Sequence, residues 1–481
     1  MQLCFYCIYM NANYRGVIMG EFGTTLQEQP KITYDIKAIN KKILSMILPI
    51  TIENILQMIA GIVSMGMVGR IDVLAVSALG ISMRITQIVW ALFKGIATGA
   101  TVFVAQYYGA GEYKKMLTVI QQTMLSTIAV VAVLEILLYI EAPILLSVFN
   151  PNDELMQQAV VYLRLVSLGL PFLAMMLIIG GVLQGMGNAR TPMLITMVMN
   201  IVNVIVGYVL IFGNMGFPAM GIRGAAIATV ISQIVAVLLG LYVLFNKKGI
   251  MNEYFNKSFF TIDMKQIGGI YRVGLPTSME SVFWQLAAII ITRAILTFGE
   301  MPFAAHQLGL QAESISYMPA AGFAVAATAF IGQALGAKDK DLAKLYFKQI
   351  MKGAMLITAV CASILIFLPG PTMSLLTNNK EIISLSSIYL ILMGIVQLPQ
   401  NATGVLSGAM RGAGYTKVPM LVAGLGLWGI RVPLVLIVAY GMKFSIVAIW
   451  SVFCIDLCAR FIICLAMFKR KNIYEKNMII R

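Results

Sequence analysis

The chain has 481 residues, of which 59% are hydrophobic and only 11% charged, and its mean hydropathy is +0.87. A sequence this apolar does not suit a water-soluble globule, and its long apolar stretches are typical of an integral membrane protein. The net charge of +15 would suit a nucleic-acid-binding protein. However, the basic residues gather at the ends of the apolar stretches, as described below, so we expect no nucleic acid as a partner.

Twelve apolar stretches predict twelve transmembrane helices and hence an all-α integral membrane protein. A helix needs about 20 apolar residues to cross a bilayer, and it bonds its own backbone groups, as lipid requires. Porin-type strands are not expected, because the apolar runs are continuous and do not alternate. In chain order the predicted helices are 43–66, 74–106, 117–146, 157–185, 193–213, 221–245, 267–297, 303–334, 345–369, 384–410, 418–440 and 444–468.

These helices divide the chain into two halves of six. A basic stretch with few apolar residues separates the halves and is predicted to be a cytoplasmic linker. The first residues lack the basic start, apolar core and cleavage site of a signal peptide, and we expect them to be disordered. The expected parts are an N-terminal leader (1–40), an N-terminal six-helix lobe (41–246), the linker (247–265), a C-terminal six-helix lobe (266–469) and a cytoplasmic tail (470–481).

The two halves repeat each other at a constant offset of 227 positions. The stretch 95–110 aligns with 322–337, with eight of sixteen residues identical, and Pro49 returns as Pro276. An even number of helices in each half gives both halves the same orientation in the membrane. A pseudo-twofold axis along the membrane normal is therefore expected to relate the two lobes, with a cavity between them.

The basic residues indicate how the chain lies in the membrane. They concentrate in the tails and the even-numbered loops, for example at Lys41, Lys114 and Lys247, whereas the odd-numbered loops hold few. This bias places the N- and C-termini in the cytoplasm, where basic residues also attract anionic lipid. We expect a monomeric, multi-pass protein of the cell (plasma) membrane, in contact with the lipid bilayer.

Several motifs resemble those of the MATE (multidrug and toxic compound extrusion) family. The first half carries IAGIVSMGMVGRID, FVAQYYGAGE and LQGMGNARTPM, and the second carries AAHQLGLQAESISYMPAAGFAVAATAFIGQALGAKD and GAMRGAGYTKVPM. The resemblance covers nearly all of residues 40–470 and is greatest to prokaryotic NorM-like and DinF-like members. It implies two six-helix bundles arranged as a V. It also implies export of amphipathic, often cationic, organic compounds, with H⁺ or Na⁺ as the coupling ion and no other cofactor.

Two acidic residues occupy equivalent places in the first helix of each half. Glu53 lies one turn beyond Pro49, with Gln57 at i+4 on the same face, and Glu280 has the same relation to the second proline. A charge inside the membrane requires a partner, a wet cavity or a function, and a proline frees a backbone carbonyl nearby. These acids are candidates for proton or cation binding, or they cap and pair near the cytoplasmic side. The alternative partners are Lys42 and Arg272.

Glu313 is the strongest candidate for ion coupling, because it lies near the middle of the eighth predicted helix. His306 at i−7 and Tyr317 at i+4 share its face, and Gln307 lies close to that face. A buried carboxyl that alternates between its protonated and charged forms can exchange a proton for a cationic compound. His306, the only histidine, is either a proton relay or a structural residue.

The second predicted helix supplies the opposite charge. Its residues Arg84, Gln87, Trp90 and Lys94 follow one another at helical spacings and form a polar stripe in an apolar segment. The second and eighth helices occupy equivalent places in the two lobes, so Glu313 is a candidate partner for Lys94. Such a pair would be a salt bridge that opens when an ion binds, or a permanent structural contact.

The sequence departs from the family pattern at two places. Many relatives have an aspartate where this chain has Ser64, and an acid in the tenth helix where this chain has only amides. The family's usual ion site therefore cannot be carried over. In this protein the coupling ion is then expected to bind at Glu53, Glu280 or Glu313, or sodium is expected to bind to side-chain amides and backbone carbonyls. The amides in question are Gln397, Gln400 and Asn401.

We therefore expect a secondary active transporter that works as an antiporter by alternating access. An enzyme is not expected, because the chain has no P-loop, no HExxH motif and no paired catalytic aspartates. The first alternative is a flippase for lipid-linked saccharides, which would use a cationic central cavity; an intramembrane enzyme is a distant second. Of the other membrane charges, Asp456 and Arg460 at i,i+4 are expected to pair.

Overall fold

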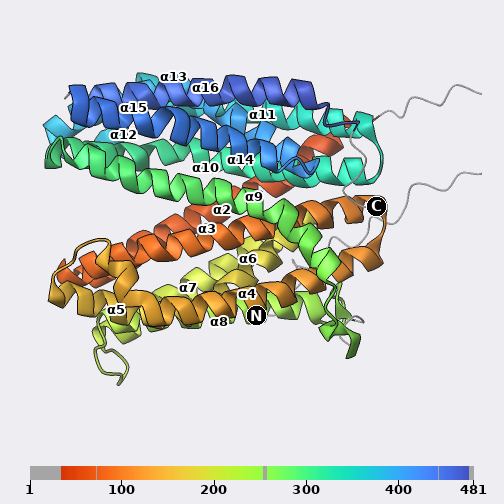
Figure 1. Ribbon diagram of the computed structural model, residues 1–481, viewed down its shortest axis with the longest axis horizontal. Helices are drawn as coiled ribbons and strands as arrows, with labels where there is room; N and C mark the ends of the chain where they lie inside the picture. Colours follow the sequence, from red (N-terminus) through yellow and green to blue (C-terminus); the bar gives the residue numbers. More distant parts are fainter. Residues whose placement is uncertain (1–33, 72, 253–256, 443, 476–481) are drawn as a thin grey trace, which may run out of the picture.

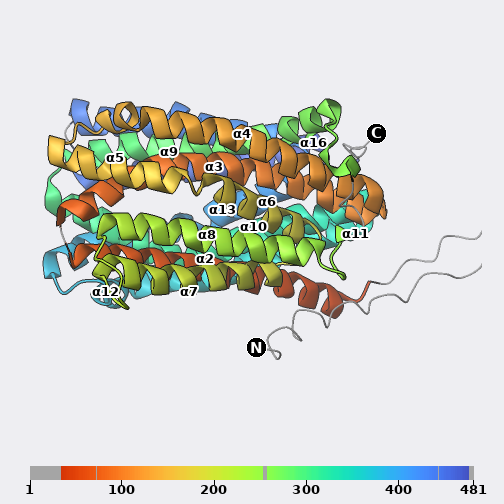
Figure 2. The ribbon, with the colours of Figure 1, turned by 90° about the horizontal axis from the view of Figure 1, so that it is seen from below.

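The computed structural model describes residues 34–71, 73–252, 257–442 and 444–475. Within these ranges the chain is almost entirely helical, and the long helices run side by side along the length of the molecule (Figures 1 and 2). Eleven helices are long and apolar enough to cross a membrane, and one bent pair raises the number to twelve. The predicted all-α membrane fold is thus confirmed.

The first half forms seven of the described helices. Figure 1 shows α4 to α8 together in its lower half, with α3 between them and the second half of the chain. The helices are α2 (Ile36–Gly69), α3 (Val73–Ala110), α4 (Tyr113–Ser147), α5 (Asp153–Ser167), α6 (Leu170–Gly185), α7 (Arg190–Phe212) and α8 (Ile222–Phe245).

The second half forms the upper part of Figure 1. A short 3₁₀ turn, η2 (Lys257–Phe260), precedes it, and two π-helical turns, η3 (Leu425–Arg431) and η4 (Ile437–Met442), interrupt its penultimate span. Its α-helices are α9 (Met264–Leu296), α10 (Glu300–Gly336), α11 (Lys340–Phe367), α12 (Pro369–Ser374), α13 (Lys380–Gly412), α14 (Lys417–Gly424), α15 (Val432–Leu436) and α16 (Ile446–Lys471).

The observed helices differ from the predicted spans mainly at their ends. Asp35 and Asp263 accept hydrogen bonds from the first backbone N–H groups of α2 and α9, so both helices begin earlier than their apolar windows. As a result α2 begins inside the segment expected to be a leader, of which residues 1–33 lie outside the described chain. The predicted fourth span is two helices, α5 and α6, that meet at 50°. Pro171, in the first turn of α6, cannot continue the preceding helix.

The first helix of each half packs partly into the core of the other half. Ile43 and Met46, in the first turns of α2, belong to a buried cluster that otherwise consists almost entirely of second-half residues such as Phe330. Conversely, Ile270 and Val273, in the first turns of α9, belong to the buried cluster of the first half. Because these positions are equivalent under the 227-residue repeat, the exchange is reciprocal, as a twofold relation produces.

Reciprocal hydrogen bonds also join the two halves at one end of the bundle. Gln106 Nε2 on α3 donates to the Gly412 carbonyl at 2.9 Å, and Gln333 Nε2 on α10 donates to the Gly185 carbonyl at 2.8 Å. The two bonds are equivalent under the repeat. At Gly336 a Cβ atom would collide with the backbone of Gln106, so glycine is required for this approach. We call this the closed end.

The closed end is also where α2 begins and α16 ends. Tyr34, just before α2, donates hydrogen bonds to Asp339, which follows α10. Burial, together with this carboxylate, raises the pKa of Tyr34 to about 12, so its hydroxyl remains a donor. Lys471, the last residue of α16, lies 6.0 Å from the ring of Tyr415. The two ends of the described part of the chain therefore lie on the same side of the bundle.

Candidate functional site

A cavity of about 240 Å³ lies beside Glu53, and we call it the Glu53 cavity. Residues from α2, α3, α6 and α7 line it on one side, and Ala321 and Val325 of α10 line it on the other. Gln57 also lines it, as expected from its position one turn after Glu53. Since α10 belongs to the second half of the chain, the cavity lies where the two halves meet.

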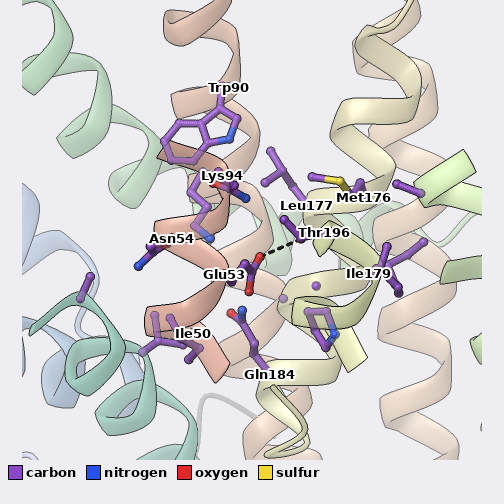
Figure 3. A pocket seen from close by; sticks show the side chains of 18 residues that line it. Ile50, Glu53, Asn54, Trp90, Lys94, Met176, Leu177, Ile179, Gln184 and Thr196 are labelled. Atoms are coloured by element: carbon purple, nitrogen blue, oxygen red, sulfur yellow. Dashed lines mark hydrogen bonds between the residues drawn. The ribbon is translucent and has the colours of Figure 1, made fainter. Parts of the chain in front are cut away.

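Glu53 is only partly satisfied in this cavity. The hydroxyl of Thr196 donates to Oε1 at 3.2 Å, whereas Oε2 is buried and has no hydrogen-bond partner in the described structure. The ammonium of Lys94 points toward Glu53 (Figure 3) and attracts it electrostatically. Among the described residues, however, the two groups form no ion pair within 4.0 Å. One carboxylate oxygen therefore remains available to a proton or to a cationic group.

Glu280, the repeat equivalent of Glu53, has a different environment. Arg411 of α13 donates to both of its carboxylate oxygens at 2.7 Å. The alternative pairing with Arg272 is therefore not formed, and neither is that of Glu53 with Lys42. Lys42 instead lies over the ring of Phe330, 5.2 Å from its centre. Glu280 is held by a structural ion pair, whereas Glu53 is not.

Glu313 lies inside the second half in a buried polar network. Its side chain is 6% exposed; it accepts a hydrogen bond from Tyr389 Oη at 2.5 Å and one from Gln397 Nε2 at 2.9 Å. His306 packs on the same tyrosine, with ring centres 5.5 Å apart. Of the other residues expected on this face, Gln307 is half-buried and Tyr317 is 44% exposed.

The polar stripe of α3 does not act as one unit. Arg84 is exposed, Gln87 lines a second cavity of about 290 Å³, and Lys94 lies deeper, beside Glu53. The suggested pairing of Lys94 with Glu313 is not formed, because each residue finds its contacts within its own half. Equivalent helices face each other, yet the residues on them are turned toward different neighbours.

The second cavity lies within the first half and is lined by uncharged polar groups. Ser64, at the place of the family's aspartate, donates to Asn203 Oδ1 at 2.9 Å. Asn200 and Gln233 also line it, and each has one buried polar atom without a partner in the described structure. No aspartate or glutamate is among its lining residues. This cavity provides hydrogen bonds but no coupling acid.

The expected ion pair between Asp456 and Arg460 in α16 is confirmed, and a second arginine also binds this aspartate. Arg460 donates to Asp456 Oδ2 at 2.7 Å, and Arg431, on the π-turn η3, donates to the same oxygen at 2.6 Å. The ring of Trp284 lies 4.6 Å from the guanidinium of Arg460 and 5.3 Å from that of Arg431. The sequence marked Arg431 as a charge within a membrane helix but did not predict its pairing with Asp456, and it did not predict Tyr389 as the partner of Glu313.

Comparison with known proteins gives matches over most of the chain. A family model described as MatE matches residues 49–209 and again residues 276–437. A probable multidrug resistance protein, NorM, from Thermotoga maritima is 28% identical over 417 residues, which cover 86% of this chain and 89% of that protein. An uncharacterized transporter, YisQ, from Bacillus subtilis is 25% identical over 431 residues, or 89% of this chain and 94% of that protein.

Solved structures support the same fold. A MOP superfamily transporter from Pyrococcus furiosus has a TM-score of 0.82 at 19% identity, with 92% of this chain and 98% of that chain covered. Its binding pocket is described as having reverse polarity, which suggests a different function for that protein. At this level of identity the likeness concerns the fold alone. The two family-model matches begin 227 residues apart, in agreement with the internal repeat.

Proposed function

The chain belongs to the MATE family of multidrug efflux transporters, and from that premise we propose that it exports small amphipathic organic compounds, including cations, in exchange for an inward-moving ion. Members of this family are transporters and not enzymes. We propose that export proceeds by alternating access, in which the closed end and the opposite end open in turn. The closed end, held by reciprocal hydrogen bonds, supports this proposal because it is a joint between two equivalent bodies.

One observation carries the proposal: Glu53 presents an unpartnered carboxylate oxygen in a cavity between the two halves. A carboxylate at this depth is unfavourable unless it is neutralised. A proton and a cationic group of a bound compound can each neutralise it, but not both at once. Mutually exclusive binding of two cargoes to one group is the requirement for antiport.

The surroundings of Glu53 favour a proton over Na⁺ as the coupling ion. Among the described residues one hydroxyl, from Thr196, donates to the carboxylate, and the second carboxylate oxygen can take up a proton without any further ligand. We propose Glu313 as a second coupling acid, because its charge is held by two hydrogen bonds that a proton on the carboxyl would disturb.

The orientation that we propose follows from the basic residues. Lys114, Lys338 and Lys469 all lie next to helix ends on the side of the closed end, and basic residues mark the cytoplasmic side of membrane proteins. The closed end is then cytoplasmic, both termini are in the cytoplasm, and the structure represents an outward-facing state. The protein would act as a monomer in the plasma membrane.

An efflux experiment in vesicles tests the proposal. Ethidium loss from proteoliposomes is measured with a proton gradient, with a sodium gradient, and with each gradient collapsed in turn. We expect efflux that stops when the proton gradient is removed. Glu53→Gln should abolish this dependence, whereas Glu135→Gln, a half-buried acid on α4 away from the cavity, should not change it. Efflux driven only by the sodium gradient would show that Na⁺, and not H⁺, is the coupling ion.

The same vesicles test the flippase alternative. Movement of a lipid-linked saccharide between leaflets, with no gradient-dependent movement of ethidium, would refute export of small compounds. Gradient-driven ethidium efflux without lipid movement would exclude the flippase. If neither the proton nor the sodium gradient drives efflux, the antiport proposal fails.

A further inference from the structure

A third cavity, of about 230 Å³, lies between the two halves, and we call it the interlobe cavity. Helices α3 and α6 line it from the first half, and α9, α10 and α13 line it from the second. Thr101 and Thr328, which are equivalent under the repeat, are both in the lining, so the cavity lies on the pseudo-twofold axis. Its other polar lining residues include Lys94, Gln184, Thr277, Ser281 and Arg411.

The charged residues of this lining are two cations, one from each half. The repeat does not account for them, because the position equivalent to Lys94 is Ala321 and the position equivalent to Arg411 is Gln184. No aspartate or glutamate is among the lining residues. Arg411 has a counter-ion in Glu280, whereas Lys94 forms no ion pair within 4.0 Å among the described residues, and a cation at this depth is unfavourable without one. Two cations from opposite bodies that face one cavity therefore favour an anionic occupant.

Arg411 keeps donors for such an occupant although it pairs with Glu280. The ion pair uses a single guanidinium nitrogen, Nη2, which donates to both carboxylate oxygens at 2.7 Å. Its Nε–H is buried and has no hydrogen-bond partner in the described structure. Glu280 thus fixes the position of the guanidinium and leaves one of its donor edges free.

The hydroxyl of Thr277 gives a second, independent indication. Thr277 is 6% exposed and lines the interlobe cavity, and its Oγ1 has no partner among the described residues. Its neighbour Ser281 and the equivalent pair Thr101 and Thr328 all donate to backbone carbonyls. A buried hydroxyl without a partner costs stability, and such groups in native structures indicate a missing ligand or water.

Lys94 is the third donor. It lies between the Glu53 cavity and the interlobe cavity and lines both. Its described contacts are the electrostatic attraction of Glu53 and the ring of Trp90, 6.0 Å away. Because neither of these is a direct hydrogen bond, the ammonium can donate to a group in the interlobe cavity.

We propose that the interlobe cavity binds an anionic group, a carboxylate or a phosphate, between Lys94 and Arg411. Both cations donate to the oxygens of the anion, and the Thr277 hydroxyl adds a further hydrogen bond. A cavity of about 150 Å³ accepts benzene, so 230 Å³ accommodates a ring together with one anionic group. Anion binding does not require transport and can be measured at equilibrium. Its role in selecting an exported compound that carries an anionic group rests on the proposed function.

Equilibrium binding to the full-length protein tests this proposal without any gradient. Benzoate and phenyl phosphate are titrated calorimetrically into protein in phosphatidylcholine nanodiscs, with benzamide as the uncharged analogue and phenyltrimethylammonium as the cation. We expect both anions to bind at least about tenfold more tightly than benzamide, since hydrogen bonds to charged groups are the stronger ones. Equal affinity of anion and amide, or no binding of either anion, overturns the proposal; binding of the cation is assigned to the Glu53 cavity if Glu53→Gln abolishes it.

Two variants assign the site. Lys94→Gln should weaken anion binding about tenfold or more, whereas Lys114→Gln, an exposed lysine outside the cavity, should leave it unchanged. Thr277→Val should weaken it about twofold to tenfold and at the same time leave the melting temperature unchanged or higher, because it removes an unpaired buried hydroxyl. A purely structural Thr277 would instead lower the melting temperature without affecting affinity. Unchanged affinity in both variants refutes the site.

A third experiment distinguishes a lipid headgroup from a free anion as the occupant of the cavity. Nanodiscs that contain phosphatidylglycerol should compete with phenyl phosphate if a lipid headgroup occupies the cavity, and should not compete if the occupant is a free anion. Either result supports an anion site and identifies its ligand. A protein that exports ethidium yet binds no anion overturns this inference alone, and one that binds anions without gradient-driven efflux overturns the proposed function alone.

Discussion

Replacing Gln106 and Gln333 together by methionine is expected to shift the protein toward states in which the closed end is open. Each amide donates one buried hydrogen bond to a carbonyl of the opposite half, at 2.9 and 2.8 Å. Methionine has a similar length but no donor, so both carbonyls would be buried without a partner when the end is closed. In the open state they would bond to water and lose nothing.

The expected magnitude follows from these two bonds. A buried hydrogen bond contributes about 1 kcal/mol net, and its loss costs more when the remaining group stays buried. Because the two sites are separate and equivalent, their effects should add to about 2 kcal/mol. Since about 1.4 kcal/mol corresponds to a factor of ten, the ratio of open to closed states should rise roughly 30-fold.

Cysteine labelling measures this ratio. A single cysteine at Thr98, which lines the interlobe cavity, is introduced after the six native cysteines are replaced by alanine. A membrane-impermeant maleimide is added from the side of the closed end. The Gln106→Met/Gln333→Met protein should be labelled roughly 30-fold faster than its parent, and each single variant roughly fivefold faster.

The repeat supplies a matched control. Thr101 and Thr328 donate to the carbonyls of Gly181 and Gly408, so each bond stays within one half. Thr101→Val and Thr328→Val should lower the melting temperature without increasing the labelling rate. If these variants and the glutamine variants accelerate labelling equally, the hydrogen bonds act on general stability and the reasoning about the closed end is refuted.

Three further substitutions give separate tests. Glu280→Gln should destabilise the protein by up to about 3 kcal/mol, because it leaves the partly buried Arg411 without its counter-ion. Adding Arg411→Gln should recover much of this loss in thermal unfolding; no recovery would show that the pair is not coupled. Asp456→Asn should lower the melting temperature still more, because two buried arginines share that carboxylate; a shift as small as that of an exposed acid would contradict this. Glu313→Gln should leave a folded protein that has lost coupled efflux. Tyr389→Phe should reduce the coupling less, because the carboxyl of Glu313 remains. Unaltered transport in Glu313→Gln would remove this acid from the mechanism.

Much of the fold could be predicted because lipid imposes few solutions. Long apolar runs in a membrane must be helices, so the positions of these runs predicted the spans. The similar stretches 95–110 and 322–337 revealed the duplication. The ends of the helices could not be read from hydropathy, since they are set by polar caps such as Asp35 and Asp263 outside the apolar windows. The π-helical turns were also not predicted, because hydropathy does not distinguish i→i+5 from i→i+4 hydrogen bonding within an apolar span.

The site was less predictable, because rotation about a helix axis decides which neighbour a side chain meets. Lys94 and Glu313 lie on equivalent helices, yet one lies beside Glu53 and the other bonds to Tyr389. The partner of Glu313 lies 76 residues away on α13, and nothing in the local sequence marks it. Only pairs within one helix, such as Asp456 and Arg460, could be assigned from spacing alone.

Residues equivalent under the repeat make the same contacts where the two halves bond to each other, but make different contacts where charged side chains lie beside a cavity. Gln106 and Gln333 preserve the duplicated closed end, and both half-sites use the same kind of donor and the same kind of carbonyl. By contrast, Glu53 has an ammonium nearby without an ion pair, whereas Glu280 has a guanidinium in direct contact. In the proposed mechanism the symmetric joint lets the two bodies rock against each other, and the two repeat-equivalent glutamates have different roles. We therefore propose that the duplicated frame supplies the motion, and that the unequal partners of the two glutamates leave Glu53, but not Glu280, free to exchange its counter-ion.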